Sequence, residues 1–315
     1  LEGIREEAGD DVRILYSQGC DLYKDKVENL AWDQDRISEA VITAENSDVV
    51  ILCVGLDETL EGEEGDTGNS DASGDKVDLH LPKVQEELIE KVTAVGKPTI
   101  VVLMAGSAID LNYAQDNCNG ILLAWYPGAR GGRAIADLLF GKESPSGKLP
   151  ITFYKDLEGM PEFTDYSMKN RTYRYMEKEA LYPFGYGLTY SDTCVTEAEV
   201  VGEVSAESDI MLKATVKNNG TVDTDEVVQV YIKDLDSPLA VRNYSLCGFK
   251  RVSLKAGEEK SVEFTISNKA MNIVDEDGNR YIAGKHFRLF AGVSQPDTRS
   301  AELTGHKPAE VEIAL

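Results

Sequence analysis

A run of closely spaced carboxylates lies between residues 55 and 82. Three glutamates crowd within it and two aspartates accompany them: Glu61, Glu63, Glu64, Asp57 and Asp66. Carboxylates this close repel one another's charge, so one that is also partly buried can keep its proton near neutral pH and serve as a general acid. A solvated acidic loop or a calcium site would give the same composition, although the Asp-x-Asx-x-Asx-Gly pattern of an EF-hand loop is absent.

The acidic run connects a predicted strand to a predicted helix. The apolar residues 49–54 before it indicate a buried parallel strand, and apolar residues recur at helical spacing after it, at Val84, Leu88 and Val92. Ligands of open parallel sheets bind beyond the carboxyl ends of the strands. This connection is far longer than the usual length of about 2–6 residues, which favours a functional role for it.

The first half of the chain alternates between strand and helix patterns. We predict strands at residues 12–16, 49–54, 98–104 and 121–125, and helices at residues 1–9, 37–47, 83–95, 111–116 and 133–140. Such alternation is typical of a doubly wound sheet with mostly parallel strands. Gly128, Gly131 and Gly132 lie between a strand and a helix, but their spacing is not GxGxxG, so we interpret them as a tight turn and not as a nucleotide site.

The second half has the pattern of an antiparallel β-sandwich. From about residue 193, Ile210, Leu212, Ala214 and Val216 alternate with polar residues, and further strands are predicted at residues 226–233, 248–252, 260–266 and 286–292. The connector before it is rich in aromatic residues. We interpret four of them as packing that pins the connector between the two domains, in preference to sugar stacking: Tyr182, Phe184, Tyr186 and Tyr190.

Composition excludes several classes of function. The net charge of −24 argues against nucleic acid or an anionic membrane as a partner and is compatible with neutral ligands. The 5 cysteines include no CxxC pair and the 3 histidines are scattered, so we expect no metal and no cofactor. Cys53 falls in a predicted buried strand, which suggests inert core thiols. Without a visible signal peptide, a cytoplasmic location is favoured over secretion.

Several strings in this sequence occur together, in this order, in one enzyme family. They are residues 55–63 (GLDETLEGE), Asp66, residues 78–82 (DLHLP), 125–128 (WYPG), 147–153 (GKLPITF), 171–175 (RTYRY), 181–190 (LYPFGYGLTY) and 248–252 (GFKRV). Over essentially all of its length the chain resembles family 3 glycoside hydrolases, the β-glucosidases and β-xylosidases. The resemblance implies an α/β-sandwich domain with a mostly parallel sheet over residues 1–153, closed by a strand at 147–153. It also implies a connector over 154–192 and an all-β fibronectin type III-like (immunoglobulin-like) sandwich over 193–315.

The resemblance also implies a retaining, exo-acting β-glucosidase whose substrate is a β-linked glucoside or oligosaccharide. In this family the nucleophilic Asp lies on an N-terminal TIM-like barrel and the acid/base Glu on a loop of the sandwich domain. That role is carried first onto Glu61, then onto Glu63 and Glu64, with a pKa raised by the neighbouring carboxylates. Substrate contacts are expected from three further residues: Asp57, Asp66 and Arg171. Arg171 is equally suited to a structural salt bridge.

Two alternatives remain open at this point. A β-xylosidase or α-arabinofuranosidase of the same family is the nearer one, because the barrel residues that probe the sugar's C5 substituent are absent from this sequence. A non-catalytic carbohydrate-binding or scaffold protein with the same two domains is the other.

In the family a strand precedes the segment equivalent to residues 1–4, within the same domain. We therefore expect this chain to begin inside the sandwich domain, without its first strand and without the barrel. The uncovered apolar faces and strand edge would be costly in water. We expect the partner to be the missing N-terminal barrel segment or another chain that carries it, and a homo-oligomer is also open.

Overall fold

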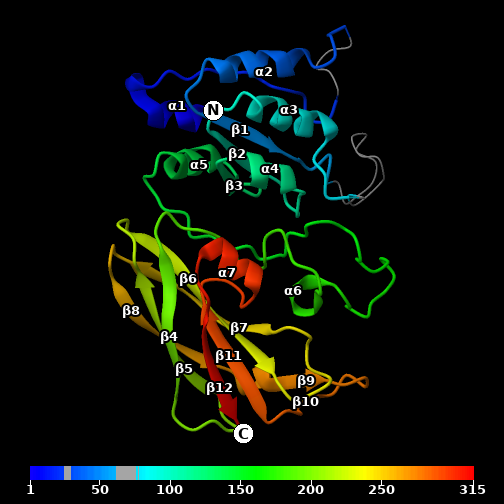
Figure 1. The fold of residues 1–315 in the computed structure, drawn as a ribbon, viewed down its shortest axis with the longest axis vertical. Helices are drawn as coiled ribbons and strands as arrows, with labels where there is room; N and C mark the ends of the chain where they lie inside the picture. Colours follow the sequence, from blue (N-terminus) through cyan, green and yellow to red (C-terminus); the bar gives the residue numbers. More distant parts are fainter. Residues whose placement is uncertain (25–29, 62–75, 77) are drawn as a thin grey trace. The chain divides into compact units, whose positions relative to one another are not determined.

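The computed structural model describes residues 1–24, 30–61, 76 and 78–315. The chain divides into two compact units, which are coloured blue to green and green to red in Figure 1. The first unit comprises Leu1–Lys142 and Lys155–Leu157, and the second comprises Glu143–Tyr154 and Glu158–Leu315. The domain limits 1–153, 154–192 and 193–315 stay predictions.

The first unit is built on a parallel sheet of three strands in the order β1-β2-β3. These are β1 (Val50–Gly55), β2 (Thr99–Met104) and β3 (Gly120–Leu123). Val50 pairs with Thr99 and Ile100 pairs with Gly120, so the three carboxyl ends lie at one edge of the sheet. The central strand β2 is buried most deeply, as expected for a strand with a neighbour on both sides.

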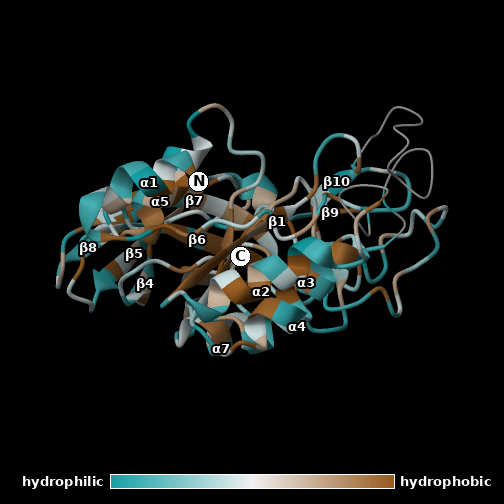
Figure 2. Ribbon diagram, turned by 90° about the horizontal axis from the view of Figure 1, so that it is seen from above, coloured by the Kyte–Doolittle hydropathy of each residue, from teal (hydrophilic) through white to brown (hydrophobic). Residues whose placement is uncertain are grey.

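Within the described residues of the first unit, five α-helices accompany this sheet. They are α1 (Glu2–Ala8), α2 (Asp35–Glu45), α3 (Lys83–Thr93), α4 (Asn112–Asn117) and α5 (Gly131–Leu139), with a 3₁₀ turn, η1, at Gly9–Asp11. Helix α2 contacts α3, α3 contacts α4, and α1 contacts α5. Helix α2 buries Ile37, Ala40 and Ala44, and the teal and brown bands along α2 and α3 in Figure 2 reflect this amphipathic pattern. The predicted α/β class is confirmed.

Three local expectations for the strands were wrong. Residues 12–16 form no strand in the described part of the chain, and Val12 and Tyr16 are 48% and 60% exposed. The closing strand at residues 147–153 reduces to one antiparallel bridge, between Phe153 and Tyr182. Alternation of apolar and polar residues gives a segment one apolar face, but a strand also needs backbone hydrogen bonds to a neighbouring strand. Cys53 is exposed on β1 while its neighbours Leu52 and Val54 are buried, because successive side chains of a strand point to opposite faces.

The second unit is an antiparallel sandwich. One sheet has the order β4-β5-β8 and the other β12-β11-β6-β7. Their bounds are β4 (Thr193–Val201), β5 (Ile210–Asn218), β6 (Thr224–Asp234), β7 (Ser245–Leu254), β8 (Glu259–Ile266), β11 (His286–Gly292) and β12 (Ala309–Ala314). The smaller elements are α6 (Thr172–Tyr175), η2 (Asn268–Met271), β9 (Asn272–Val274), β10 (Arg280–Ile282) and α7 (Thr298–Thr304).

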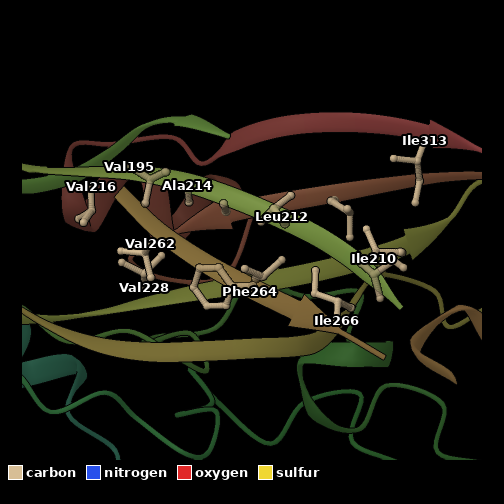
Figure 3. Packing of buried hydrophobic residues seen from close by; sticks show 14 of the residues in the cluster. Val195, Ile210, Leu212, Ala214, Val216, Val228, Val262, Phe264, Ile266 and Ile313 are labelled. Carbon is tan, nitrogen blue, oxygen red and sulfur yellow. The ribbon is translucent and has the colours of Figure 1, made fainter. Parts of the chain in front are cut away.

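The sandwich core is made by the inward-facing residues of the two sheets. Figure 3 shows Ile210, Leu212 and Phe264 of β5 and β8 directed into this core, and all three are almost fully buried. Beside the core, Tyr173 stacks on Phe184 with 4.3 Å between ring centroids. Tyr182 stacks on Tyr186 at 5.6 Å. Tyr173 also packs edge to face on Tyr231 of β6 with 6.1 Å between ring centroids, which fixes this part of the connector to the sandwich, whereas Tyr190 is largely exposed.

Candidate active site

Three loops converge at the carboxyl edge of the parallel sheet. Glu61 follows β1, Gly106 and Ser107 follow β2, and Tyr126 follows β3. The Glu61 carboxylate accepts hydrogen bonds from all of them: the Ser107 hydroxyl donates to Oε1, while the Tyr126 hydroxyl and the Gly106 N–H, at 3.0 Å, donate to Oε2. This edge is where a parallel sheet is expected to bind ligands.

A short turn leads from β1 to Glu61. The N–H groups of Leu60 and Glu61 donate to the Asp57 carbonyl at 3.1 and 3.0 Å. The Asp57 carboxylate accepts from the backbone N–H of Thr59 at 2.9 Å and from its hydroxyl at 2.6 Å. Asp57, predicted to contact substrate, therefore shapes this turn in the structure.

Two backbone features allow the loops to approach so closely. A Cβ atom on Gly106 would lie 2.8 Å from Glu61 Oε2 and 2.8 Å from the Tyr126 ring, so a side chain at this position would displace both. Trp125, the residue before Tyr126, has a φ of 52°, a left-handed conformation that is strained for a bulky residue. Strain of this kind persists only where the surrounding structure holds it, and it gathers at functional sites.

The electrostatics of Glu61 differ from the sequence-based expectation. Burial alone would raise the pKa of Glu61, but the hydrogen bonds from Ser107, Tyr126 and Gly106, together with the positive charge of Lys76, lower it on balance. The expectation of a raised pKa was therefore wrong for this carboxyl, because the donors from the neighbouring strand ends and Lys76 together outweigh the effect of burial. The pKa of Tyr126 is raised by burial and by its bond to Glu61.

The positive charge of Lys76 acts on this cluster. Its ammonium group donates to the Ala108 carbonyl at 3.0 Å. Burial lowers its pKa, while Glu61 and Asp78 raise it. A lysine held here partly neutralises Glu61 and leaves the site suited to an uncharged ligand.

The other predicted site residues are distributed as follows. Glu63, Glu64 and Asp66 lie outside the described residues. Arg171 belongs to the second unit, where its guanidinium donates to the carbonyls of Pro161, Glu162 and Asp165 at 3.3, 2.8 and 3.3 Å. This guanidinium fixes its own loop.

Sequence reasoning missed Ser107, Tyr126 and Lys76. Ser107 and Tyr126 each follow a predicted strand, which is the signal that could have found them. Within the described residues, no three His, Cys, Asp or Glu side chains gather as metal ligands. None of the helices described is long and apolar enough to cross a membrane.

Comparison with known proteins decides the family. Residues 1–190 match the model of the glycosyl hydrolase family 3 C-terminal domain. The chain belongs to glycoside hydrolase family 3. Residues 226–295 match the fibronectin type III-like domain, which agrees with the predicted two-domain order.

Relatives named for glycosidase activities are similar over most of the chain. A xylan 1,4-beta-xylosidase of Xylanibacter ruminicola is 39% identical over 84% of this chain. A periplasmic beta-glucosidase of Salmonella typhimurium is 30% identical over 93% of it. The solved β-glucosidase of Erythrobacter marinus covers 100% of the chain with a TM-score of 0.82 and 31% identity. The chain spans only 31%, 40% and 42% of these three proteins, respectively.

Proposed function

We propose that this chain contributes the acid/base carboxyl group to a retaining, exo-acting β-glucosidase that releases terminal β-D-glucosyl residues. The observation that carries the proposal is the Glu61 cluster, in which a carboxylate-bearing segment of a family 3 chain is held at the ligand-binding edge of a parallel sheet. The names of the Salmonella and Erythrobacter relatives support glucosidase activity.

A retaining glycosidase needs two carboxyl groups about 5–5.5 Å apart. In the proposed enzyme an Asp of a TIM-like barrel outside this sequence attacks the anomeric carbon and forms a covalent glycosyl intermediate. A carboxyl group of the acidic segment protonates the departing oxygen, and its carboxylate then takes a proton from the attacking water. Glu61, Glu63 and Glu64 are the candidates for this group, and Asp57, Asp66 and Arg171 are the proposed substrate contacts. No cofactor takes part.

The second candidate is β-xylosidase activity. It is favoured by the 39% identity to the Xylanibacter xylosidase and by the 34% identity to a beta-xylosidase of Formosa agariphila over 96% of this chain. Glucose and xylose differ only in the C5 substituent, and the residues that would read it belong to the barrel. An α-arabinofuranosidase and a non-catalytic carbohydrate-binding or scaffold protein remain the further alternatives.

We also propose that further polypeptide covers the first unit at β1. Among the described residues, β1 pairs with β2 alone, and the preceding Val49 is 52% exposed. An apolar edge strand without charged or proline protection invites pairing. The proposed occupant is the barrel-bearing segment, with a homo-oligomer as the alternative. The charge of −24 disfavours nucleic acid and anionic membranes, and a cytoplasmic location stays a proposal.

A panel of aryl glycosides tests this function. The enzyme that contains both this chain and a barrel should hydrolyse aryl β-glucosides faster than β-xylosides or α-arabinofuranosides, while the isolated chain should be inactive. A higher rate on xylosides would select the second candidate. If the complete enzyme hydrolyses none of the three but still binds glucan, the non-catalytic alternative holds. Turnover by the isolated chain would contradict the two-carboxyl assignment.

A further inference from the structure

We propose that Glu61 is a positioning residue. It anchors the start of the acidic run (residues 55–82) to the loops that follow β2 and β3, through Gly106, Ser107 and Tyr126. The proton for the leaving group then comes from a different carboxyl group. Only the statement about the proton donor rests on the proposed glycosidase function. The anchoring by Glu61 can be measured without turnover.

Hydrogen-bond capacity is the first argument. Both carboxylate oxygens of Glu61 act as acceptors, Oε1 from Ser107 and Oε2 from Gly106 and Tyr126. A general acid must instead point its own O–H at the leaving oxygen. The hydroxyls of Ser107 and Tyr126 could reverse their roles, but a backbone N–H can only donate. Gly106 therefore favours the ionised form of Glu61.

The shape of the two partner loops is the second argument. The missing side chain at Gly106 makes room for the carboxylate, and the left-handed Trp125 directs the chain from β3 into Tyr126. Both features lie in the loops that donate hydrogen bonds to Glu61. The sheet thus presents a ready receptor for one carboxylate.

Charge is the third argument. Ser107, Tyr126, Gly106 and Lys76 all face Glu61 and lower its pKa against the effect of burial. Burial and Glu61 raise the pKa of Tyr126 most, and the negative charge of Asp57 raises it further by a smaller amount. A catalytic acid works best with a pKa near the operating pH, so these donors move Glu61 away from that role.

The anchor is tested in the chain itself. The carboxyl carbon of Glu61 is titrated by NMR in the wild type and in Tyr126→Phe and Ser107→Ala, and the exchange of the Gly106 amide is measured in Glu61→Ala. We expect a pKa for Glu61 below its ordinary value of 4.5, an upward shift of that pKa in each variant, and about tenfold faster exchange at Gly106. Tyr113→Phe is the matched control, since Tyr113 shares a 3.0 Å bond with Thr93 elsewhere in the same unit.

The role is tested in the complete enzyme through kcat, KM and the pH profile. Glu61→Gln and Tyr126→Phe should lower kcat about 10- to 100-fold with little change in KM, leave the basic limb of the profile in place, and gain nothing from added azide. Glu58→Gln should match the wild type.

Two outcomes would overturn the inference. If Glu61→Gln removes the basic limb and azide restores its turnover, Glu61 is the proton donor. If the pKa of Glu61 and the exchange at Gly106 are the same in all variants, there is no anchor. A wild-type enzyme inactive on every glycoside would instead refute the proposed function, and the NMR and exchange results would still decide whether Glu61 is an anchor.

Discussion

Lys148 and Glu226 form an ion pair inside the second unit, with 2.7 Å between Nζ and Oε1 and side chains that are only 9% and 2% exposed. The remaining polar atoms are also satisfied. Lys148 donates to the Gly187 carbonyl at 2.6 Å, and Glu226 accepts from the Thr193 hydroxyl at 2.5 Å and from the Val227 N–H at 2.7 Å. The pair joins the segment before the connector to β6 of the sandwich.

Breaking this pair on one side should destabilise the second unit strongly. In Lys148→Met the buried Glu226 charge loses its partner, and we expect the free energy of unfolding to fall by about 3–5 kcal/mol. Urea unfolding of the chain measures this loss. The surface pair Lys213–Glu199 provides the control, because Lys213→Met should cost less than about 1 kcal/mol. Equal losses in the two variants would show that the pair is not desolvated.

The connector should depend on its stacked rings. Tyr173 stacks on Phe184, and its hydroxyl accepts from the Leu246 N–H at 3.0 Å. Tyr173→Ala removes both contacts and should destabilise the second unit by about 3–5 kcal/mol, as judged by thermal unfolding. The exposed Tyr281 is the control residue, and Tyr281→Ala should change stability by about 0.5 kcal/mol or less. A Tyr173→Ala protein as stable as this control would contradict the packing role.

Gly106 should tolerate no side chain. In Gly106→Ala the new methyl group would collide with Glu61 Oε2 and the Tyr126 ring, so the carboxylate must leave its receptor. We expect the pKa of Glu61, followed by NMR, to rise toward its ordinary value. Gly132→Ala is the matched control, since a Cβ there meets nothing within 4 Å. An unchanged pKa in Gly106→Ala would mean that Glu61 is held by other contacts.

The lowered pKa of Glu61 makes a signed contribution to stability. Its ordinary value is 4.5 and its folded value is lower, so the unfolded chain binds more protons in the window below 4.5. The contribution is complete above 4.5 and is lost as the pH falls through the folded value. The stability difference between wild type and Glu61→Gln should therefore shrink with acidification, which urea titrations at several pH values would measure. A difference that grows below pH 4.5 would reverse the sign of the argument.

Local patterns predicted the elements better than they predicted their partners. The apolar run at 49–54 predicted β1, and the helical spacing of Val84 and Leu88 predicted α3. Both predictions succeeded because the pattern of buried positions within one element is visible in the residues of that element. The strand expected at residues 12–16 failed because pairing requires another segment. Glu61 was singled out from its place after the apolar run, and the direction of its pKa shift was predicted wrongly. Ser107 and Tyr126, which set it, are distant in sequence and near only in the folded sheet.

The position of Trp125 next to Tyr126 has a practical consequence. The sequence contains 2 tryptophans, and the other, Trp32, is 85% exposed in a different part of the first unit. After Trp32→Phe, the indole of Trp125 would be the sole tryptophan fluorophore of this chain, one residue from the hydroxyl that binds Glu61. Its emission would report on protonation of the neighbouring Glu61 carboxylate in real time, without any attached dye.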